Sequence, residues 1–240
     1  VCIGMPRAAS RMTWQILKML QGNDSRGSHG YISSDAPVIY SYRHPVEAFL
    51  SLCSRHMQDV GKRVNADLLR DMEITENNIS EATTEVTREH AFYASILSII
   101  PHRNIYKQLL EDSDSGRPVL FLRYEDFYKD EERRVLAIQK FLKRDISESK
   151  LKKICENVSL TKNAERGQEV IRKNPDALFA GNFYEEGIQR GHVNMQTMGS
   201  PGSHIKLNQE FIKIVLENQE KFYVHLRKMC QEMNYHLQVL

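Results

Sequence analysis

The sequence predicts an α/β fold in which a parallel sheet is flanked by helices. Three short apolar runs, 1–5, 37–42 and 117–124, have the length and composition of buried strands. A segment with helical periodicity follows each run, and strands that alternate with helices pair in parallel. In such sheets ligands bind beyond the carboxyl ends of the strands. The segments that follow the three runs are therefore the first places to look for chemistry.

The first two runs are each followed by a clear helix signal. Pro6 breaks the first run, and apolar residues at helical spacing then predict a helix over 10–20. Residues 22–30 are rich in Gly, Ser, Asn and Asp, which predicts a loop. The second run leads into a helix that starts at Pro45, because proline is tolerated in a first helical turn.

The rest of the chain reads mostly as helix. Residues 64–112 are expected to be largely helical, with Ser80 or Thr84 as the cap of the part that runs to residue 100. Residues 165–205 have weak periodicity and predict a long irregular segment. The charged run at 130–134, DEERR, is interpreted as a solvated helix turn. Helical patterns also cover 129–143, 147–158 and 207–233.

The composition is that of an ordinary soluble domain. The chain has 240 residues, 41% of them hydrophobic, and a net charge of +2, so no global charge favours nucleic acid or an anionic membrane. No apolar run is long enough to span a bilayer, and no signal-peptide pattern is seen. The four cysteines form no CxxC pair and the nine histidines form no HExxH pattern, so we predict no metal site. We expect one cytoplasmic domain over 1–240 with reduced thiols, and a homodimer is left open.

The first turn, PRAAS, contains several groups that can bind an anion. A helix N-terminus presents backbone N–H groups and a positive dipole end. Arg7 and Arg11 add guanidinium groups, and Ser10 adds a hydroxyl. The pattern GxxxxGK[ST] is absent, which argues against an ATPase or a kinase. The alternative is an ordinary turn with surface arginines.

The segment that follows the second predicted strand, RHPVEAFLS, contains two more residues that can bind an anion. Arg43 stands directly before the proline-started helix, and Ser51 follows eight residues later. Both side chains can converge on one anion. The alternative is that Arg43 pairs with a carboxylate while Ser51 lies on the helix surface.

Three motifs in order, PRAASR, RHPVEAFLS and LRYEDF, give the chain a family resemblance. It resembles the sulfotransferases that use 3'-phosphoadenosine 5'-phosphosulfate (PAPS) and release 3',5'-phosphoadenosine (PAP). The resemblance covers residues 1 to about 160. It implies a P-loop-like nucleotide-binding sulfotransferase fold without a metal, and sulfuryl transfer to a hydroxyl or amine of an acceptor, with a small molecule favoured.

The resemblance also implies a role for each matching residue. Arg7 contacts the 5'-phosphosulfate, while Arg43 and Ser51 hold the 3'-phosphate. The segment 165–205 becomes a lid. The other implied nucleotide-binding residues are Ala8, Ala9, Ser10, Arg11 and Met12 at the 5'-phosphate, Tyr124, Ser159 and Leu160 at the adenine, and Arg190 and Gly191 over the 3'-phosphate.

The first turn departs from the family pattern in two ways. Ala8 and Ala9 stand where the family usually has Ser-Gly or Gly-Gly, and added methyl groups restrict how closely a backbone approaches phosphate. The family's tryptophan aligns with Met12, and Trp14 falls two residues later. Either the adenine lacks a stacking partner, or the loop carries a local insertion.

A histidine is the expected general base, because its pKa suits proton transfer near neutral pH. His29 lies in the loop before the second strand, where family members often carry K-[ST]-H, and we predict that it is the base. His56 and His90 are alternatives on predicted helices, and a solvent-exposed loop histidine is the non-catalytic reading. The rival functions are a non-catalytic PAP-binding protein and a small-molecule or nucleotide kinase.

Overall fold

The computed structural model describes residues 1–22, 25–57, 60–61, 63–65, 83–159, 161–163, 165, 169, 172 and 220–235. The described residues fall into two compact units. The first contains residues 1–43 and those from 109 to 172, and the second contains residues 44–108 and 220–235. Most of the predicted lid lies outside the described residues, as do Leu160, Arg190 and Gly191, so their roles stay predictions.

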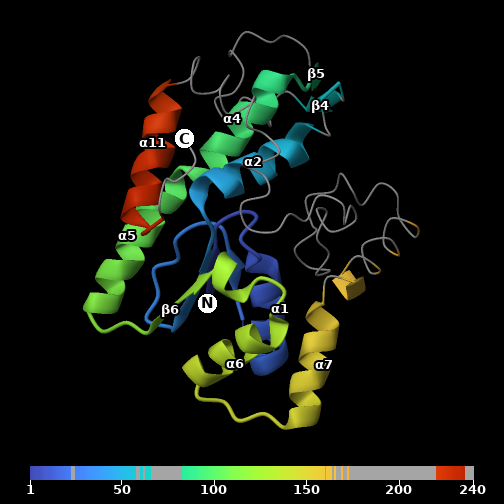
Figure 1. Ribbon diagram of the computed structural model, residues 1–240, viewed down its shortest axis with the longest axis vertical. Coiled ribbons are helices and arrows are strands. Elements are labelled where there is room, and N and C mark those ends of the chain that lie inside the picture. Colours follow the sequence, from blue (N-terminus) through green and yellow to red (C-terminus); the bar gives the residue numbers. More distant parts are fainter. Residues whose placement is uncertain are drawn as a thin grey trace. The chain divides into compact units, whose positions relative to one another are not determined.

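The first unit is built on a four-stranded parallel sheet with the order β2-β1-β3-β6 (Figure 1). Its paired strands run in parallel throughout, with Gly4 opposite Ser41 and Tyr42 opposite Arg123. This confirms the predicted parallel sheet and its three apolar strands. The strands are β1 (Cys2–Gly4), β2 (Gly27–Ser28), β3 (Val38–Tyr42) and β6 (Val119–Arg123).

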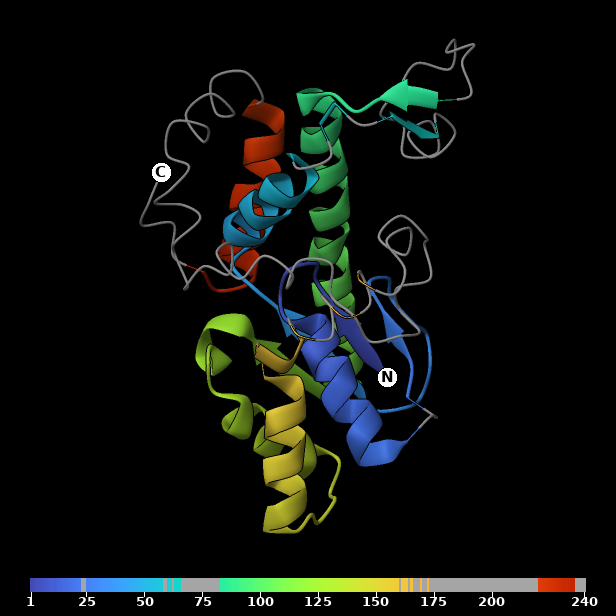
Figure 2. The same ribbon diagram turned by 90° about the vertical axis from the view of Figure 1, so that its right-hand side faces the viewer.

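Three helices pack together in this unit, α1 (Ser10–Gln21), α6 (Glu131–Phe141) and α7 (Glu148–Val158). They lie side by side in Figure 2. Their apolar faces and one face of the sheet form a single core, which is why each carries apolar residues at helical spacing. That core contains Cys2, Met12, Ile16, Leu17, Leu20, Ile39, Leu122, Val135, Ile138, Ile154 and Val158.

The edge strand β2 corrects the prediction of a loop over 22–30. Cys2 donates its backbone N–H to the carbonyl of Arg26 at 2.7 Å, and Gly27 and Ser28 then pair with β1. A Cβ at position 27 would lie 2.8 Å from the Trp14 ring, so this strand needs glycine to pass α1. The consequence is that His29 follows directly on a strand of the sheet.

The second unit contains α2 (Pro45–His56), α4 (Arg88–Ile99) and α11 (Glu220–Glu232), with α2 packed against both other helices. The helix α5 (Pro101–Asp114) begins in this unit and ends in the first. Two short strands, β4 (Arg63–Asn65) and β5 (Thr83–Glu85), pair antiparallel within the stretch that was expected to be largely helical, so that expectation is wrong there.

The start of α4 also differs from the prediction. Neither Ser80 nor Thr84 caps the helix. The hydroxyl of Thr87 accepts from the backbone of His90, and the His90 ring accepts from the backbone of Thr87. This reciprocal pair satisfies two N–H groups of the helix end. His90, which was an alternative candidate for the general base, therefore has a structural role at this helix end.

A bidentate ion pair ties α11 to α5 within the second unit. Arg103 donates to both carboxylate oxygens of Glu232, at 2.5 and 2.6 Å, and Lys107 lies 3.0 Å away. These partners lower the pKa of Glu232 from 4.5 to about 2. The ion pair therefore stabilises the fold fully above pH 4.5, and this contribution is lost as the pH falls towards 2.

Glu232→Gln is expected to lower the free energy of unfolding at pH 7 by about 1 kcal/mol, because a half-exposed bidentate pair is lost. The difference from the wild type should shrink as the pH is lowered from 5 towards 3. Urea unfolding across this range measures it, with the exposed Glu132→Gln as control. A difference that does not depend on pH would show that the carboxylate charge is not the cause.

Candidate functional site

The carboxyl ends of β1, β3 and β6 meet at one edge of the sheet in the first unit. The backbone of Met5 donates to the carbonyl of Ser41 at 2.9 Å, which extends the β1–β3 pairing to the start of the turn. The guanidinium of Arg43 then donates to the carbonyl of Arg7 at 3.4 Å. The structure therefore brings the first turn and the second strand exit into contact.

The turn over residues 6–9 adopts a backbone that glycine usually supplies. Arg7 and Ala9 have φ values of 65° and 56°, in the left-handed region that costs most residues about 1 kcal/mol. Ala9 is also the N-cap of α1 and provides no side-chain cap. The first-turn N–H groups of a helix have no partner within the helix. The turn thus presents a positive helix end in a shape that suits a phosphate or sulfate oxygen.

Gly4 allows the strand and the helix to approach each other closely. A Cβ at this position would lie 2.1 Å from the Cβ of Ser10 and 3.1 Å from its Cα. Only glycine therefore fits where β1 faces the first residue of α1. The motif comparison did not single out this residue, although a glycine at the end of a strand is itself a signal of close backbone approach.

His29 lies beside this turn. Its Nδ1 lies 2.5 Å from the carbonyl oxygen of Gly4, which can only accept, so Nδ1 carries the proton and the basic lone pair is on Nε2. Burial lowers the pKa of His29, the hydrogen bond to Gly4 raises it and the charge of Arg11 lowers it, with a net decrease. The ring is therefore neutral at pH 7, which is the form that a general base needs.

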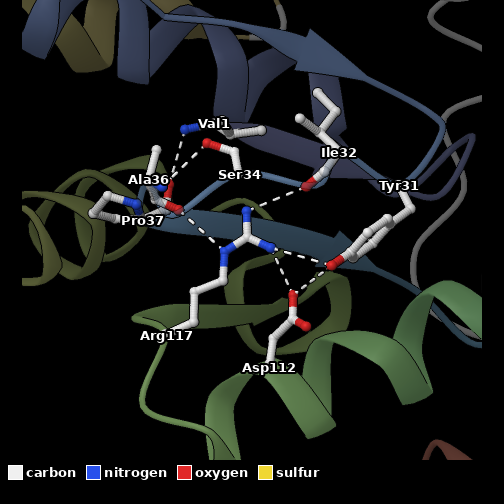
Figure 3. Close-up of polar contacts among 8 residues, drawn as sticks. All are labelled: Val1, Tyr31, Ile32, Ser34, Ala36, Pro37, Asp112 and Arg117. Carbon is white, nitrogen blue, oxygen red and sulfur yellow. Dashed lines mark hydrogen bonds and ion pairs between the residues drawn. The ribbon is translucent and has the colours of Figure 1, made fainter.

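The segment 30–37 after His29 is fixed by Arg117 (Figure 3). Arg117 pairs with the carboxylate of Asp112 at 2.6 Å and donates to two carbonyls of the segment, at 3.2 and 3.3 Å. The Tyr31 hydroxyl donates to the same carboxylate at 2.9 Å. This cluster holds the segment that follows His29.

The alternative base His56 lies in the second unit. Its Nδ1 is 2.9 Å from the hydroxyl of Ser95, which donates to a backbone carbonyl of α4. The imidazole therefore bridges α2 and α4, which gives it a structural partner.

Arg43 and Tyr124 form a stacked pair at the same sheet edge. Arg43 is 3% exposed, and its guanidinium lies 4.4 Å from the centre of the Tyr124 ring. Tyr124 begins the short 3₁₀ helix η2 (Tyr124–Phe127) directly after β6. Burial raises the pKa of its hydroxyl, and the charges of Arg43 and Arg134 act in the opposite direction. The pair places a cation and an aromatic ring next to the turn.

Ser159 ends α7 and is joined to α1 through a neighbour. Its hydroxyl accepts from the backbone of Lys162 at 3.3 Å. Asn163, 1% exposed, accepts from the side chain of Gln15 at 3.0 Å and donates to the Ser159 carbonyl at 3.1 Å. This connects the turn around Ser159 to the second turn of α1, the helix that follows the turn over residues 6–9.

No described contact links the other predicted residues to the sheet edge where Arg7, Arg43 and Tyr124 lie. Met12 is 6% exposed and lies in the apolar core. Trp14 packs on Gly27 and lies under the ammonium of Lys18, 5.2 Å from the ring centre. Ser51 is buried on α2 in the second unit, so its convergence with Arg43 stays a prediction.

All four cysteines are free, and three of them are buried, as predicted. No group of three or more His, Cys, Asp or Glu among the described residues is placed to hold a metal ion. In the same part of the chain, no helix is long and apolar enough to cross a membrane.

A sequence model of the sulfotransferase domain matches residues 25–194, which is more than half of the chain. The chain belongs to the sulfotransferase domain family. The match includes His29, Arg43, Ser51, Tyr124 and Ser159 and begins after the turn over residues 6–9. In this sulfotransferase domain, the prediction that the turn binds the 5'-phosphosulfate therefore depends on the motif and the geometry of the turn itself.

A search of solved structures matches the mouse sulfotransferase SULT7A1 complexed with PAP. The identity is 14% and the TM-score 0.49, over 94% of this chain and 87% of that chain. The family assignment of this sulfotransferase domain does not depend on that likeness. A search of curated proteins found no significant match.

Proposed function

We propose that this sulfotransferase domain transfers the sulfuryl group of PAPS to a hydroxyl or amine of an acceptor, most simply a small molecule, and releases PAP. Family membership supports sulfuryl transfer in general. The observation that carries the proposal is the contact between His29 and Gly4. The imidazole lies at the strand end that opens the turn over residues 6–9, which supports a general base beside the proposed donor site.

The donor is proposed to bind across the three strand ends. Arg7 and the N-terminal end of α1 hold the 5'-phosphosulfate, because a helix end and a guanidinium both favour anions. Arg43, with Ser51, holds the 3'-phosphate. The adenine lies beside Tyr124. The remaining proposed contacts are Ala8, Ala9, Ser10, Arg11, Met12, Ser159, Leu160, Arg190 and Gly191.

The proposed chemistry is an in-line displacement at sulfur. His29 Nε2 accepts the proton of the acceptor hydroxyl or amine as the acceptor forms its bond to sulfur. The bond between sulfur and the bridging oxygen breaks, and its electron pair stays on the 5'-phosphate. Arg7 stabilises the negative charge on that oxygen. Holding both reactants in line is the other contribution of the protein.

Calorimetric titration with PAP, ADP and ATP at a fixed low salt concentration tests the donor assignment. We expect tight binding of PAP and weak binding of ADP and ATP, because only PAP carries a 3'-phosphate. Equal affinity for all three nucleotides would overturn the proposal. PAP-specific binding without turnover of PAPS on any of a broad panel of acceptors would instead indicate a non-catalytic nucleotide-binding protein.

Arg43→Met is expected to weaken PAP binding about 10- to 100-fold, because a buried charge-assisted contact to the 3'-phosphate is lost. Binding of adenosine 5'-phosphosulfate, which lacks the 3'-phosphate, should change by less than about threefold. The exposed Arg144→Met is the matched control. An equal loss for both nucleotides would show that Arg43 supports the loop rather than reads the 3'-phosphate.

A further inference from the structure

Arg134 on α6 is a buried cation in the first unit. It is 2% exposed, whereas its neighbour Arg133 is exposed. The reading of the run DEERR as a solvated turn is therefore wrong at its last residue. Arg134 lies on the inner face of the helix, one position before Val135 of the core.

Arg134 has few polar partners for a buried charge. Its Nη1 donates to the hydroxyl of Thr13 at 3.3 Å, and its Nε is buried without a hydrogen-bond partner. The Phe127 ring lies 5.6 Å away. Arg134 makes no ion pair with any residue in the described part of the chain. Burial lowers the pKa of Arg134 to about 10, so the group stays charged at neutral pH.

A buried charge without an ion pair is destabilising, and the Glu131 carboxylate, which favours charged Arg134 from a distance, offsets only part of its desolvation. Such a group is expected where a counter-charge arrives with a ligand. The hydrogen bonds of Arg134 indicate which group of the ligand supplies this counter-charge. Thr13 donates its hydroxyl to the Ala9 carbonyl at 3.2 Å and accepts from Ser41 at 2.8 Å. Arg134 is thus two hydrogen bonds away from the N-cap of α1.

Arg134 also acts on the sheet edge. Its charge and that of Arg43 both lower the pKa of the Tyr124 hydroxyl, against the effect of burial. The two guanidinium groups therefore act electrostatically on the same ring, one stacked on it and one in the core. Arg43 contacts the Arg7 carbonyl directly and Arg134 is linked to Ala9 through Thr13, so both charges favour an anion at the turn over residues 6–9.

We propose that Arg134 is a positioning residue for the 5'-anionic end of the nucleotide, acting as its buried counter-charge and through Thr13 on the left-handed Ala9. This inference rests on the proposed function. It adds to the turn a cation that does not touch the ligand and that is supplied by a helix from a later part of the chain. It assigns Arg134 to the 5'-end, whereas Arg43 is assigned to the 3'-phosphate.

The test compares three substitutions in titrations with PAP and with adenosine 3'-monophosphate, which lacks the 5'-phosphate. Arg134→Met removes the charge and all donors, Arg134→Gln removes the charge but keeps a shorter amide donor, and Arg134→Lys keeps the charge with a different donor group. We expect both neutral variants to weaken PAP binding about tenfold, through loss of a nearby charge in a low-dielectric site. Arg134→Lys should stay within about threefold of the wild type, and adenosine 3'-monophosphate should bind all variants equally.

Thermal unfolding without ligand separates positioning from a structural role. Replacing a buried unpaired charge with an apolar side chain is neutral or stabilising. Arg134→Met is therefore expected to melt at or above the wild-type temperature while it loses PAP affinity. Arg133→Met, on the same helix but exposed, is the matched control. If Arg134→Met does not fold, Arg134→Gln and Arg134→Lys give the same comparison of charge.

The outcomes distinguish the inference from the proposed function. Wild-type affinity for PAP in both neutral variants overturns the inference and leaves the proposed function in place. An equal loss for PAP and adenosine 3'-monophosphate also overturns it, because Arg134 would then support the whole site. Failure of the wild-type protein to prefer PAP over ADP removes the proposed function itself.

Discussion

His29→Gln is expected to lower the rate of sulfuryl transfer by about 10²-fold or more, while PAP affinity stays within about twofold of the wild type. The glutamine amide can still donate to the Gly4 carbonyl, which His29 contacts at 2.5 Å. The variant therefore keeps the local packing but has no group that can take a proton. A PAPS turnover assay and a PAP titration on the same preparation measure the two effects.

The pH profile gives a second readout of the same group. Only neutral imidazole accepts a proton, so kcat/KM should fall on the acid side as His29 is protonated. Because burial and Arg11 lower the pKa of His29, this fall should occur below the usual histidine pKa of 6.5. The acid limb should be missing from the residual activity of His29→Gln.

His225→Gln, an exposed histidine on α11, is the control for the general effect of removing an imidazole. It should leave both the rate and the pH profile unchanged. Wild-type turnover in His29→Gln would exclude His29 as the base.

Gly4→Ala is expected to cost about 3 kcal/mol of stability and to abolish measurable PAP binding. The added methyl group would lie 2.1 Å from the Cβ of Ser10, and overpacking of this kind forces the backbone to move. The displaced groups are the strand end and the first turn of α1, which together form the proposed 5'-phosphosulfate site. Urea unfolding and PAP titration measure the two losses.

Two further variants identify the cause of the Gly4→Ala effect. At Gly30 an added Cβ would meet only the Ser28 hydroxyl at 3.6 Å, so Gly30→Ala should be nearly neutral. Adding Ser10→Gly to Gly4→Ala removes the clashing Cβ and should restore part of the stability. A Gly4→Ala protein as stable as the wild type would contradict the close approach of β1 and α1.

The sheet that carries the proposed site was predictable because its central strands, β1 and β3, are buried almost throughout, and β6 is apolar up to its last residue. Such strands appear as continuous apolar runs, and β1, β3 and β6 were each visible in this way. The helices after them were visible through their spacing and through Pro45. The contact between the Arg43 guanidinium and the Arg7 carbonyl followed from the rule that parallel strands end at one edge.

The missed elements are those that tertiary contacts determine. β2 consists of Gly27 and Ser28, which have no strand propensity, and pairing with β1 alone makes it a strand. The cap of α4 uses histidine rather than glutamate or glutamine as the return partner, so the usual capping signature is absent. In both cases the local sequence favours no single structure.

The burial of Arg134 was not predicted, for a different reason. An arginine in a charged run is normally solvated, and no local pattern distinguishes the one that turns inward. Its burial becomes visible only when its partner Thr13 on α1, which also accepts from Ser41 on β3, is brought to it by the fold. A polar residue at a core position of each element, Thr13 in α1 and Ser41 in β3, was the available signal.

Gly4 links two parts of the proposed site, and this limits how the protein can be redesigned. Its missing side chain admits Ser10, and its carbonyl sets which nitrogen of His29 is basic. On the proposed mechanism, donor recognition and proton removal therefore share one backbone unit and are mechanically coupled. Redesign of the donor loop would alter the orientation of the base at the same time. A change of acceptor preference that leaves Gly4 and its two contacts in place would, on the same mechanism, leave both functions intact.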